Sequence, residues 1–166
     1  MKVRVAGIVD DSIVDGDGIR LTLFVQGCPR HCAGCQNPEA LDPSGGHSMT
    51  TAEIAKRLDA NPLLSGITFS GGEPFLQPRP LLELAREAHR RGMDVWSYSG
   101  YTLEQLHARD DADTENLLRE LDVLVDGDFQ IEKRDLTLKF RGSSNQRVID
   151  MNATRKADKV VLLYTD

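Results

Sequence analysis

Three cysteines confined to one short loop constrain this sequence more than any other feature. Cys28, Cys32 and Cys35 are the only cysteines among 166 residues, and their spacing is C-x3-C-x2-C. Three thiolates this close can hold three corners of one cubane iron–sulfur cluster. Because there is no fourth cysteine, the fourth iron would keep an open position that can bind a substrate, as an open zinc site does. Gly27 and Gly34 permit the tight backbone that wraps such a cluster.

Other uses of cysteine fit this spacing less well. A structural zinc site, with His31 or another histidine as fourth ligand, would normally draw its ligands from two separated knuckles, and here there is one. A plain electron carrier has four cysteines for each cluster. A secreted disulfide framework would spread its cysteines along the chain. The pattern therefore favours a [4Fe–4S] cluster with one open iron, and a non-enzymatic zinc-binding module stays as an alternative.

The composition is that of an ordinary globular protein, and it excludes some partners. Hydrophobic residues make up 40% of the chain and charged residues 28%, and the length fits one domain over residues 1–166. The net charge of −6 offers no broad attraction to nucleic acid or to anionic lipid. The sequence shows neither a signal peptide nor an apolar run near the roughly 18 residues of a membrane helix. We expect a cytoplasmic protein without a nucleic-acid or membrane partner.

Short β-rich runs alternate with helical stretches. The Thr50–Glu53 capping box predicts a helix to about Leu58, and apolar residues on one helical face predict another that ends at Gly92. A short helix and a further one are expected between the strands at residues 94–98 and 123–126. This pattern predicts an α/β fold, a partial (open) parallel β/α barrel of about five to six units. Strands are expected at residues 3–9, 21–25, 67–70, 94–98, 123–126 and 159–164, with a loop-rich segment at about 127–147.

Polar and glycine-rich loops follow four of the predicted strands. They come after Val25, Ser70, Tyr98 and Asp126. Active sites of parallel sheets lie at the C-terminal ends of the strands, so the loops are expected to meet in one site. The loop Gly71–Pro74 is an ordinary strand-to-helix connection when taken alone, and its place one unit after the cysteine loop favours a functional reading.

Several motifs together carry a resemblance to a known family. The cysteine spacing is similar to that of the radical S-adenosylmethionine (SAM) superfamily. Over nearly its whole length the chain resembles the activating proteins of anaerobic ribonucleoside-triphosphate reductase, which are glycyl-radical-enzyme activases with a radical SAM-type partial barrel. The matching segments are Val14–Arg20, Phe24–Pro29, Gln36–Glu39, Phe69–Pro74, Val125–Phe129 and Arg141–Arg147.

The resemblance implies roles for individual residues. Cys28, Cys32 and Cys35 would ligate the cluster, and its open iron would bind the amino and carboxylate groups of SAM. The residues implied to contact SAM are Gly71, Gly72 and Glu73 at the amino group, Gly34, Cys35 and Gln36 at the adenine, Ser97 and Ser99 at the ribose or carboxylate, and Asp126 nearby. Residues implied to contact the partner or substrate are Asp15, Gly16, Gly18, Arg20, Arg141, Asn145 and Gln146.

Two positions depart from the family pattern. The turn before the second strand usually reads Asp-Gly-Pro-Gly, and here Asp17 stands in place of the proline. The turn is expected to be kept but to be less rigid. In the related pyruvate formate-lyase activase a lysine lies two residues after the strand-end acid, whereas this chain has Asp128. A lysine contact with the SAM carboxylate is therefore not expected here.

The implied reaction is the activation of anaerobic ribonucleoside-triphosphate reductase. An external one-electron reductant such as flavodoxin would reduce the cluster, which would cleave SAM to methionine and a 5′-deoxyadenosyl radical. That radical would take a hydrogen atom from a glycine Cα of the reductase. No catalytic residue is expected beyond the cluster and SAM. The alternative is another small radical SAM enzyme, either a different glycyl-radical activase or an enzyme acting on a small molecule of the deazapurine type.

Overall fold

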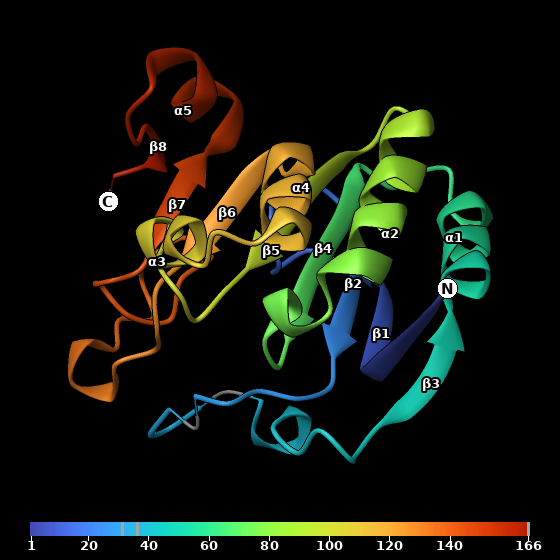
Figure 1. Cartoon of the computed structure of the whole chain (residues 1–166), viewed down its shortest axis with the longest axis horizontal. Helices are drawn as coiled ribbons and strands as arrows, with labels where there is room; N and C mark the ends of the chain where they lie inside the picture. The colour runs from blue at the N-terminus through green and yellow to red at the C-terminus, as the bar shows by residue number, and fades with distance from the viewer. Residues whose placement is uncertain (31, 36, 166) are drawn as a thin grey trace.

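The computed structural model describes residues 1–30, 32–35 and 37–165, and these residues form one mixed sheet with helices packed on it (Figure 1). The strand order is β3-β1-β2-β4-β5-β6-β7-β8. The strands are β1 (Lys2–Ser12), β2 (Arg20–Val25), β3 (His47–Thr50), β4 (Gly66–Gly71), β5 (Asp94–Tyr98), β6 (Val123–Asp126), β7 (Arg147–Asp150) and β8 (Leu162–Tyr164).

The centre of the sheet is parallel and its flanks are antiparallel. Strands β2, β4, β5 and β6 pair in parallel, whereas β1 pairs antiparallel with β2 and with β3, and β7 pairs antiparallel with β6 and with β8. The expected open sheet of parallel strands alternating with helices is confirmed. The estimate of five to six units counted the first and last strands, which here lie outside the parallel part. A short connection such as that from β1 to β2 allows only an antiparallel pair.

Helix α1 begins at its predicted capping box. The helices are α1 (Thr51–Ala60), α2 (Pro78–Arg90), α3 (Leu103–Ala108), α4 (Ala112–Glu120) and α5 (Met151–Ala157). The predicted capping box of Thr50 with Glu53 forms at α1, and Thr102 with Gln105 forms a second one at α3. Strands β3 and β7 and helix α5 were not predicted, because each is short and carries little periodic signal.

Alternation along the strands separates two faces of the sheet. Helices α1, α2 and α4 cover one face of the sheet (Figure 1). Leu23, Phe69 and Leu124 belong to the main apolar core, together with Leu81 and Leu84 of α2. The opposite face carries a smaller apolar cluster, formed by Trp96, Val123, Val125 and Val148 with Tyr98, Phe140 and Tyr164 packed against it. Side chains one position apart in a strand therefore face different surroundings. Among the described residues no helix combines the length and apolarity that a membrane crossing requires.

A histidine fastens the helix layer to the sheet. The ring of His89, at the end of α2, contacts Glu120 through Nδ1 and Asp122 through Nε2, each at 3.0 Å. Asp122 also accepts hydrogen bonds from the amide of Val95 and from Asn152. Burial alone would lower the pKa of His89, but the bonds and charges of the two carboxylates outweigh it and raise that pKa above its ordinary value.

This contact makes the stability of the fold depend on pH. Because the folded-state pKa of His89 is raised, its stabilising contribution is complete below the unfolded value near 6.5 and is lost as the pH rises through the folded value. We expect His89→Gln to reduce the free energy of unfolding by about 1 kcal/mol at pH 5.5 and by less at pH 9, since the ring is partly exposed. Urea unfolding of both proteins across this range measures the difference. Parallel profiles would contradict the ion pair.

Candidate active site

One cavity of about 1020 Å³ opens at the C-terminal ends of the parallel strands, on the side of the sheet opposite the helices. It gathers loops from four strand ends, as the sequence predicted. Its lining includes, of the residues expected at the site, Cys28, Cys32, Cys35, Gly71, Gly72, Glu73, Ser99, Asp15, Arg141 and Gln146. The structure thus brings all three cysteines and the glycine-rich loop to one wall.

The stem of the cysteine loop is held by backbone hydrogen bonds. Gly27 donates to the carbonyl of Ala40 at 2.7 Å, and Cys28 donates to that of Leu41 at 3.0 Å. Farther along, the amide of Asn37 donates to Cys35 Sγ at 3.4 Å. Such N–H groups aimed at sulfur stabilise thiolate character. The loop therefore returns to its starting point and presents its sulfurs to the cavity.

Gly34 is the tightest point of the cysteine loop. Its φ of 72° lies in the left-handed region, and a Cβ there would come within 2.7 Å of Cδ1 of Ile131. Both observations require glycine. The loop thereby packs closely against the segment that follows β6. Gln36, also expected to contact SAM, lies outside the described residues.

The donor set fits a cluster with one thiolate at each of three irons. None of the three cysteines forms a disulfide, and all three are partly exposed. Among the described residues, no three side chains of Cys, His, Asp or Glu converge closely enough to hold a single metal ion. A cubane does not need a common centre, because its irons lie at separate corners. Three cavity-facing sulfurs in one loop are compatible with that requirement.

The loop after β4 is joined to the base of the cysteine loop. The amide of Gly72 donates to Val25 O, and the amide of Glu73 donates to Gly27 O, both at 2.8 Å. A Cβ at position 72 would lie 2.2 Å from that same Gly27 oxygen. The two backbones can approach this closely only because residue 72 is glycine. Any displacement of one loop therefore moves the other.

The carboxylate of Glu73 is buried and fully engaged. It accepts hydrogen bonds from the amide of Phe75 at 3.0 Å, from Ser99 Oγ at 3.0 Å and from the amide of Gly100 at 2.7 Å. Burial raises the pKa of Glu73, and these hydrogen bonds with the charge of Arg109 oppose that rise. The side chain therefore ties the loop after β4 to the loop after β5, and its backbone is what faces the cavity.

Ser97 and Asp126 lie away from the cavity, which differs from their expected contact with SAM. Both occupy strand positions whose side chains point to the helix face, since Trp96 and Val125 beside them face the other way. Neither residue lines the cavity. Tyr98, which was not predicted, lines it instead. Strict alternation along β5 would have identified Tyr98 from the sequence.

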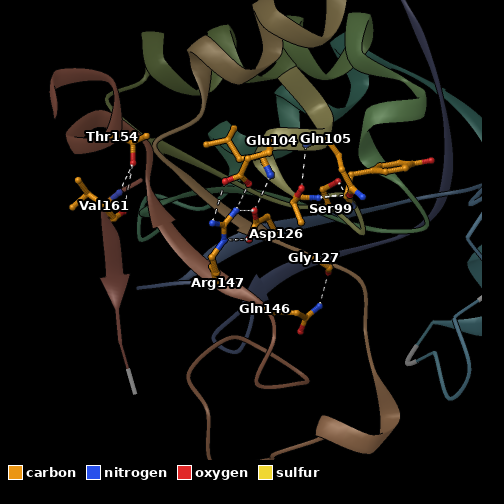
Figure 2. A network of polar contacts seen from close by, with 12 residues as sticks. Ser99, Glu104, Gln105, Asp126, Gly127, Gln146, Arg147, Thr154 and Val161 are labelled. Carbon is orange, nitrogen blue, oxygen red and sulfur yellow. Dashed lines mark hydrogen bonds and ion pairs between the residues drawn. The ribbon is translucent and has the colours of Figure 1, made fainter. Parts of the chain in front are cut away.

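Asp126 anchors the start of α3 and the strand β7. Its carboxylate accepts from the amide of Leu103 at 2.8 Å and from Arg147, which also bonds Glu104 (Figure 2). The hydrogen bond that Arg147 donates to the Asp126 carboxylate raises the pKa of Arg147, and burial opposes this rise. The guanidinium thus stays charged and joins two elements behind the cavity wall.

Two side-chain bonds continue the pairing of β6 with β7 beyond the strands. Asn145 Nδ2 donates to Asp128 O at 2.8 Å. Gln146 Nε2 donates to Gly127 O at 3.0 Å (Figure 2). Together with the Asp126–Arg147 pair they form three successive rungs. Of the residues expected to contact a partner here, Arg141 and Gln146 line the cavity, whereas Asn145 does not. The rungs close the base of the excursion over residues 127–146.

Arg20 has a different place from the one expected. Its side chain is fully buried, and it donates to Thr68 Oγ1 at 2.7 Å and to three backbone carbonyls. It also pairs with the Asp94 carboxylate at 2.6 Å. Burial lowers the pKa of Arg20, and the carboxylate of Asp94 opposes this effect. A partner cannot reach this side chain. Its position at the start of a buried strand makes it a fixed point for the preceding turn.

The turn before β2 depends on its glycines. Gly16 has a φ of 134° and Gly18 a φ of 80°. A Cβ at Gly18 would come within 2.3 Å of Ser65 Oγ, and one at Gly16 would lie 3.0 Å from Trp96. These two glycines therefore serve packing rather than contact with a partner, while Asp15 lines the cavity.

Arg30, within the cysteine loop, is a cavity residue that the sequence analysis missed. Its guanidinium lies 3.6 Å from Asp128 and 4.8 Å from the centre of the Tyr101 ring. The loop that carries the sulfurs is thus linked by charge to the excursion after β6 and by ring contact to the loop after β5. The sequence signal that could have indicated this contact is the positive charge of Arg30 between two cysteines, together with the negative charge of Asp128.

Comparison with known proteins agrees with this geometry. Residues 14–149 match a family model described as a 4Fe-4S single cluster domain. The chain is 38% identical over 143 residues to the anaerobic ribonucleoside-triphosphate reductase-activating protein of Vibrio cholerae serotype O1, covering 81% of this chain and 89% of that protein.

Two further similarities are shorter or weaker. The pyruvate formate-lyase-activating enzyme of Clostridium pasteurianum is 37% identical over 95 residues, which cover 54% of this chain and 40% of that enzyme. The crystal structure of QueE from Escherichia coli is similar with a TM-score of 0.48 at 15% identity, over 61% of this chain and 54% of that one. The resemblance inferred from the motifs is confirmed at nearly full length for the first relative: this chain belongs to the family of anaerobic ribonucleoside-triphosphate reductase-activating proteins.

Proposed function

We propose that this chain activates an anaerobic ribonucleoside-triphosphate reductase by generating a glycyl radical on it. The observation that carries the proposal is that the three cysteines, none of them in a disulfide, and the Gly71–Glu73 loop line the same large cavity. When bound, a [4Fe–4S] cluster and SAM supply the reductive cleavage that yields a 5′-deoxyadenosyl radical able to take hydrogen from a glycine Cα.

The cysteines hold the cluster, and the glycine-rich loop holds SAM. Cys28, Cys32 and Cys35 supply one thiolate to each of three irons and leave the fourth iron open. The carbonyl groups of Gly71 and Gly72 accept from the SAM ammonium, since glycine allows the main chain to approach closely. The carboxylate of Glu73 takes no direct part, because its three hydrogen bonds hold it inside the protein.

The remaining walls orient the cofactor and exclude water. Cys35 lines the cavity on the proposed adenine side, with Gly34 and Gln36 beside it in sequence, and Ser99 and Tyr98 line it after β5. Asp126 and Ser97 act from the helix face as positioning residues. An enclosed, low-dielectric site strengthens these polar contacts and protects a reactive radical from solvent.

The mouth of the cavity admits the glycine-bearing segment of the reductase. Three residues of the cavity lining lie within the first and last segments that this chain shares with the family: Asp15, Arg141 and Gln146. Reduction requires an external one-electron donor, and flavodoxin is the class we propose. The reaction is placed in the cytoplasm.

A second candidate function is supported by a similarity that covers only part of the chain. The similarity to a pyruvate formate-lyase-activating enzyme extends over 95 residues, which cover 54% of this chain. A different glycyl-radical activase or a small-molecule radical SAM enzyme would share SAM cleavage but not the reductase. Mixing with the reductase, SAM and reductant should give a glycyl doublet in electron paramagnetic resonance. An intact cluster that cleaves SAM without this doublet would favour the second function.

Cys32→Ala should abolish SAM cleavage. Loss of one thiolate leaves two sulfurs, which cannot hold the cluster with one open iron. After anaerobic reconstitution with iron and sulfide and reduction by dithionite, wild-type protein should release 5′-deoxyadenosine, measured by chromatography, and the variant should release none above background. Equal release from both proteins would contradict the cluster assignment.

Gly72→Ala should separate cluster binding from SAM cleavage. The added Cβ would meet Gly27 O at 2.2 Å, so the loop must move while all three cysteines remain. We expect iron content near that of the wild type and 5′-deoxyadenosine formation about 100-fold lower, as for a displacement near 1 Å at a reacting centre.

Gly7→Ala is the matched control, because a Cβ there meets nothing within 4 Å and its backbone is not left-handed. It should behave as wild type. If Gly72→Ala cleaves SAM as fast as Gly7→Ala, the loop after β4 does not hold SAM.

A further inference from the structure

A closed circuit of contacts joins the start of the chain to its end. The hydroxyl of Tyr164 in β8 donates to both carboxylate oxygens of Asp17, at 2.9 and 2.8 Å, across 147 positions of sequence. The ring of Tyr164 packs on Phe140 at 5.9 Å between centroids, and Phe140 packs edge-on against Trp96 at 5.2 Å. We call Asp17, Arg20, Trp96, Phe140 and Tyr164 the closing cluster.

Arg20 completes the circuit because it contacts both Trp96 and Asp17. Its guanidinium lies 5.3 Å from the centre of the Trp96 ring, and its Nη1 donates to Asp17 O at 2.9 Å. Arg20 and Trp96 are buried, and their own partners are fixed in the sheet. The rigid part of the circuit therefore lies in the parallel strands, and the bond between Asp17 and Tyr164 crosses its open edge.

The turn that carries Asp17 has little stiffness of its own. Asp17 stands between Gly16 and Gly18, both with positive φ. Glycine on either side leaves the unfolded chain unusually free, so the turn needs tertiary contacts to keep one conformation. The Asp17 carboxylate provides such a contact from outside the turn. A bond to an ionised acceptor is stronger than one between neutral groups.

We call the hydrogen bond between Tyr164 and Asp17 the clasp, and its Tyr164 side is also constrained. Phe140 has a φ of 60°, a conformation rare for a bulky residue and maintained only where surrounding packing requires it. The packing comes from Trp96 and Tyr164, while the ammonium of Lys139 lies 4.7 Å from the centre of the Tyr164 ring. Tyr164 is thus gripped from the excursion after β6 while it bonds the turn after β1.

Both segments joined by this clasp form the rim of the cavity. Ile13 and Val14 precede the turn and are each 71% exposed, and Leu136 precedes Phe140 and is 77% exposed; all three line the cavity. Large apolar side chains left in solvent beside a deep cavity indicate a surface that another molecule covers. The width of the mouth depends on how these two segments are held relative to each other.

We propose that Asp17 and Tyr164 are positioning residues that set the rim of the cavity for entry of the partner's glycine-bearing segment. This inference rests on the proposed function for the identity of the partner, but the clasp itself is a property of this chain alone. Neither residue touches the reacting atoms. Their bond holds the turn that follows Ile13 and Val14, which line the same cavity as Leu136, so that apolar residues beside the target glycine meet a preformed surface rather than a mobile one.

The test uses Tyr164→Phe, which removes only the hydroxyl, Asp17→Asn, which removes the charge, and the double variant. Hydrogen exchange of the amides at residues 13–18, followed by mass spectrometry on the full chain, reads the clasp without any cofactor. We expect exchange about tenfold faster in Tyr164→Phe, a smaller increase in Asp17→Asn, which keeps an amide oxygen as a weaker acceptor, and no increase in the double variant beyond that of Tyr164→Phe, since all three act on one interaction. Glu132→Gln, an exposed acid in the excursion, should leave this exchange at the wild-type rate. Wild-type exchange in both single variants would overturn the clasp.

The functional part compares two yields in reconstituted protein. SAM cleavage without the reductase should be unchanged in Tyr164→Phe, whereas the glycyl radical formed for each 5′-deoxyadenosine should fall several-fold and the KM for the reductase should rise. Faster exchange with an unchanged radical yield and KM would overturn the positioning role. Failure of wild-type protein to cleave SAM would instead contradict the proposed function, and the exchange result would still decide the clasp.

Discussion

The buried carboxylate of Glu73 is the contact on which the arrangement of the cavity depends. A carboxylate taken out of water costs several kcal/mol unless hydrogen bonds satisfy it, and here three donors do so. They belong to the segment after β4 and to the loop after β5, while the Glu73 amide bonds Gly27 at the end of β2. One residue therefore fixes three strand ends. The cysteine loop has few internal hydrogen bonds among its described residues, and it takes its position from this framework.

The excursion after β6 is held in a different way. Its base is closed by the rungs of Asp126 with Arg147, Gly127 with Gln146 and Asp128 with Asn145. Side-chain amides here do what backbone groups do within a sheet, so the two chains can stay paired while their backbones diverge around the cavity. The polar residues of the Arg141–Arg147 segment are therefore explained by their structural role in this pairing. The rungs keep the excursion against the cysteine loop at Gly34, and Arg141 and Gln146 of the same segment line the cavity directly.

Much of this could be predicted from the sequence, and the misses have physical causes. Capping boxes and apolar periodicity located α1, α2 and the parallel strands, since those signals are local. Cysteine spacing identified the cluster loop because so few residues are needed to define it. Ser97 and Asp126 were misplaced because a motif gives proximity along the chain, whereas strand alternation decides which face a side chain reaches. Arg20 was misread for a related reason: its partners Thr68 and Asp94 are distant in sequence, and only the fold reveals the burial.

The two faces of the sheet divide the work of the molecule. The helix face is fixed by an apolar core and by paired groups such as His89 with Asp122, so it can hold strand ends in place. The cavity face has no helix layer among the described residues and is closed instead by a turn, an excursion and the terminal strand. An antiparallel flank on each side of four parallel strands leaves this face open enough for a large partner. An open face must still keep its rim in one conformation, and contacts between segments far apart in sequence can do this without filling the cavity. The Asp17–Tyr164 bond, at the position where the family pattern has a proline, is such a contact.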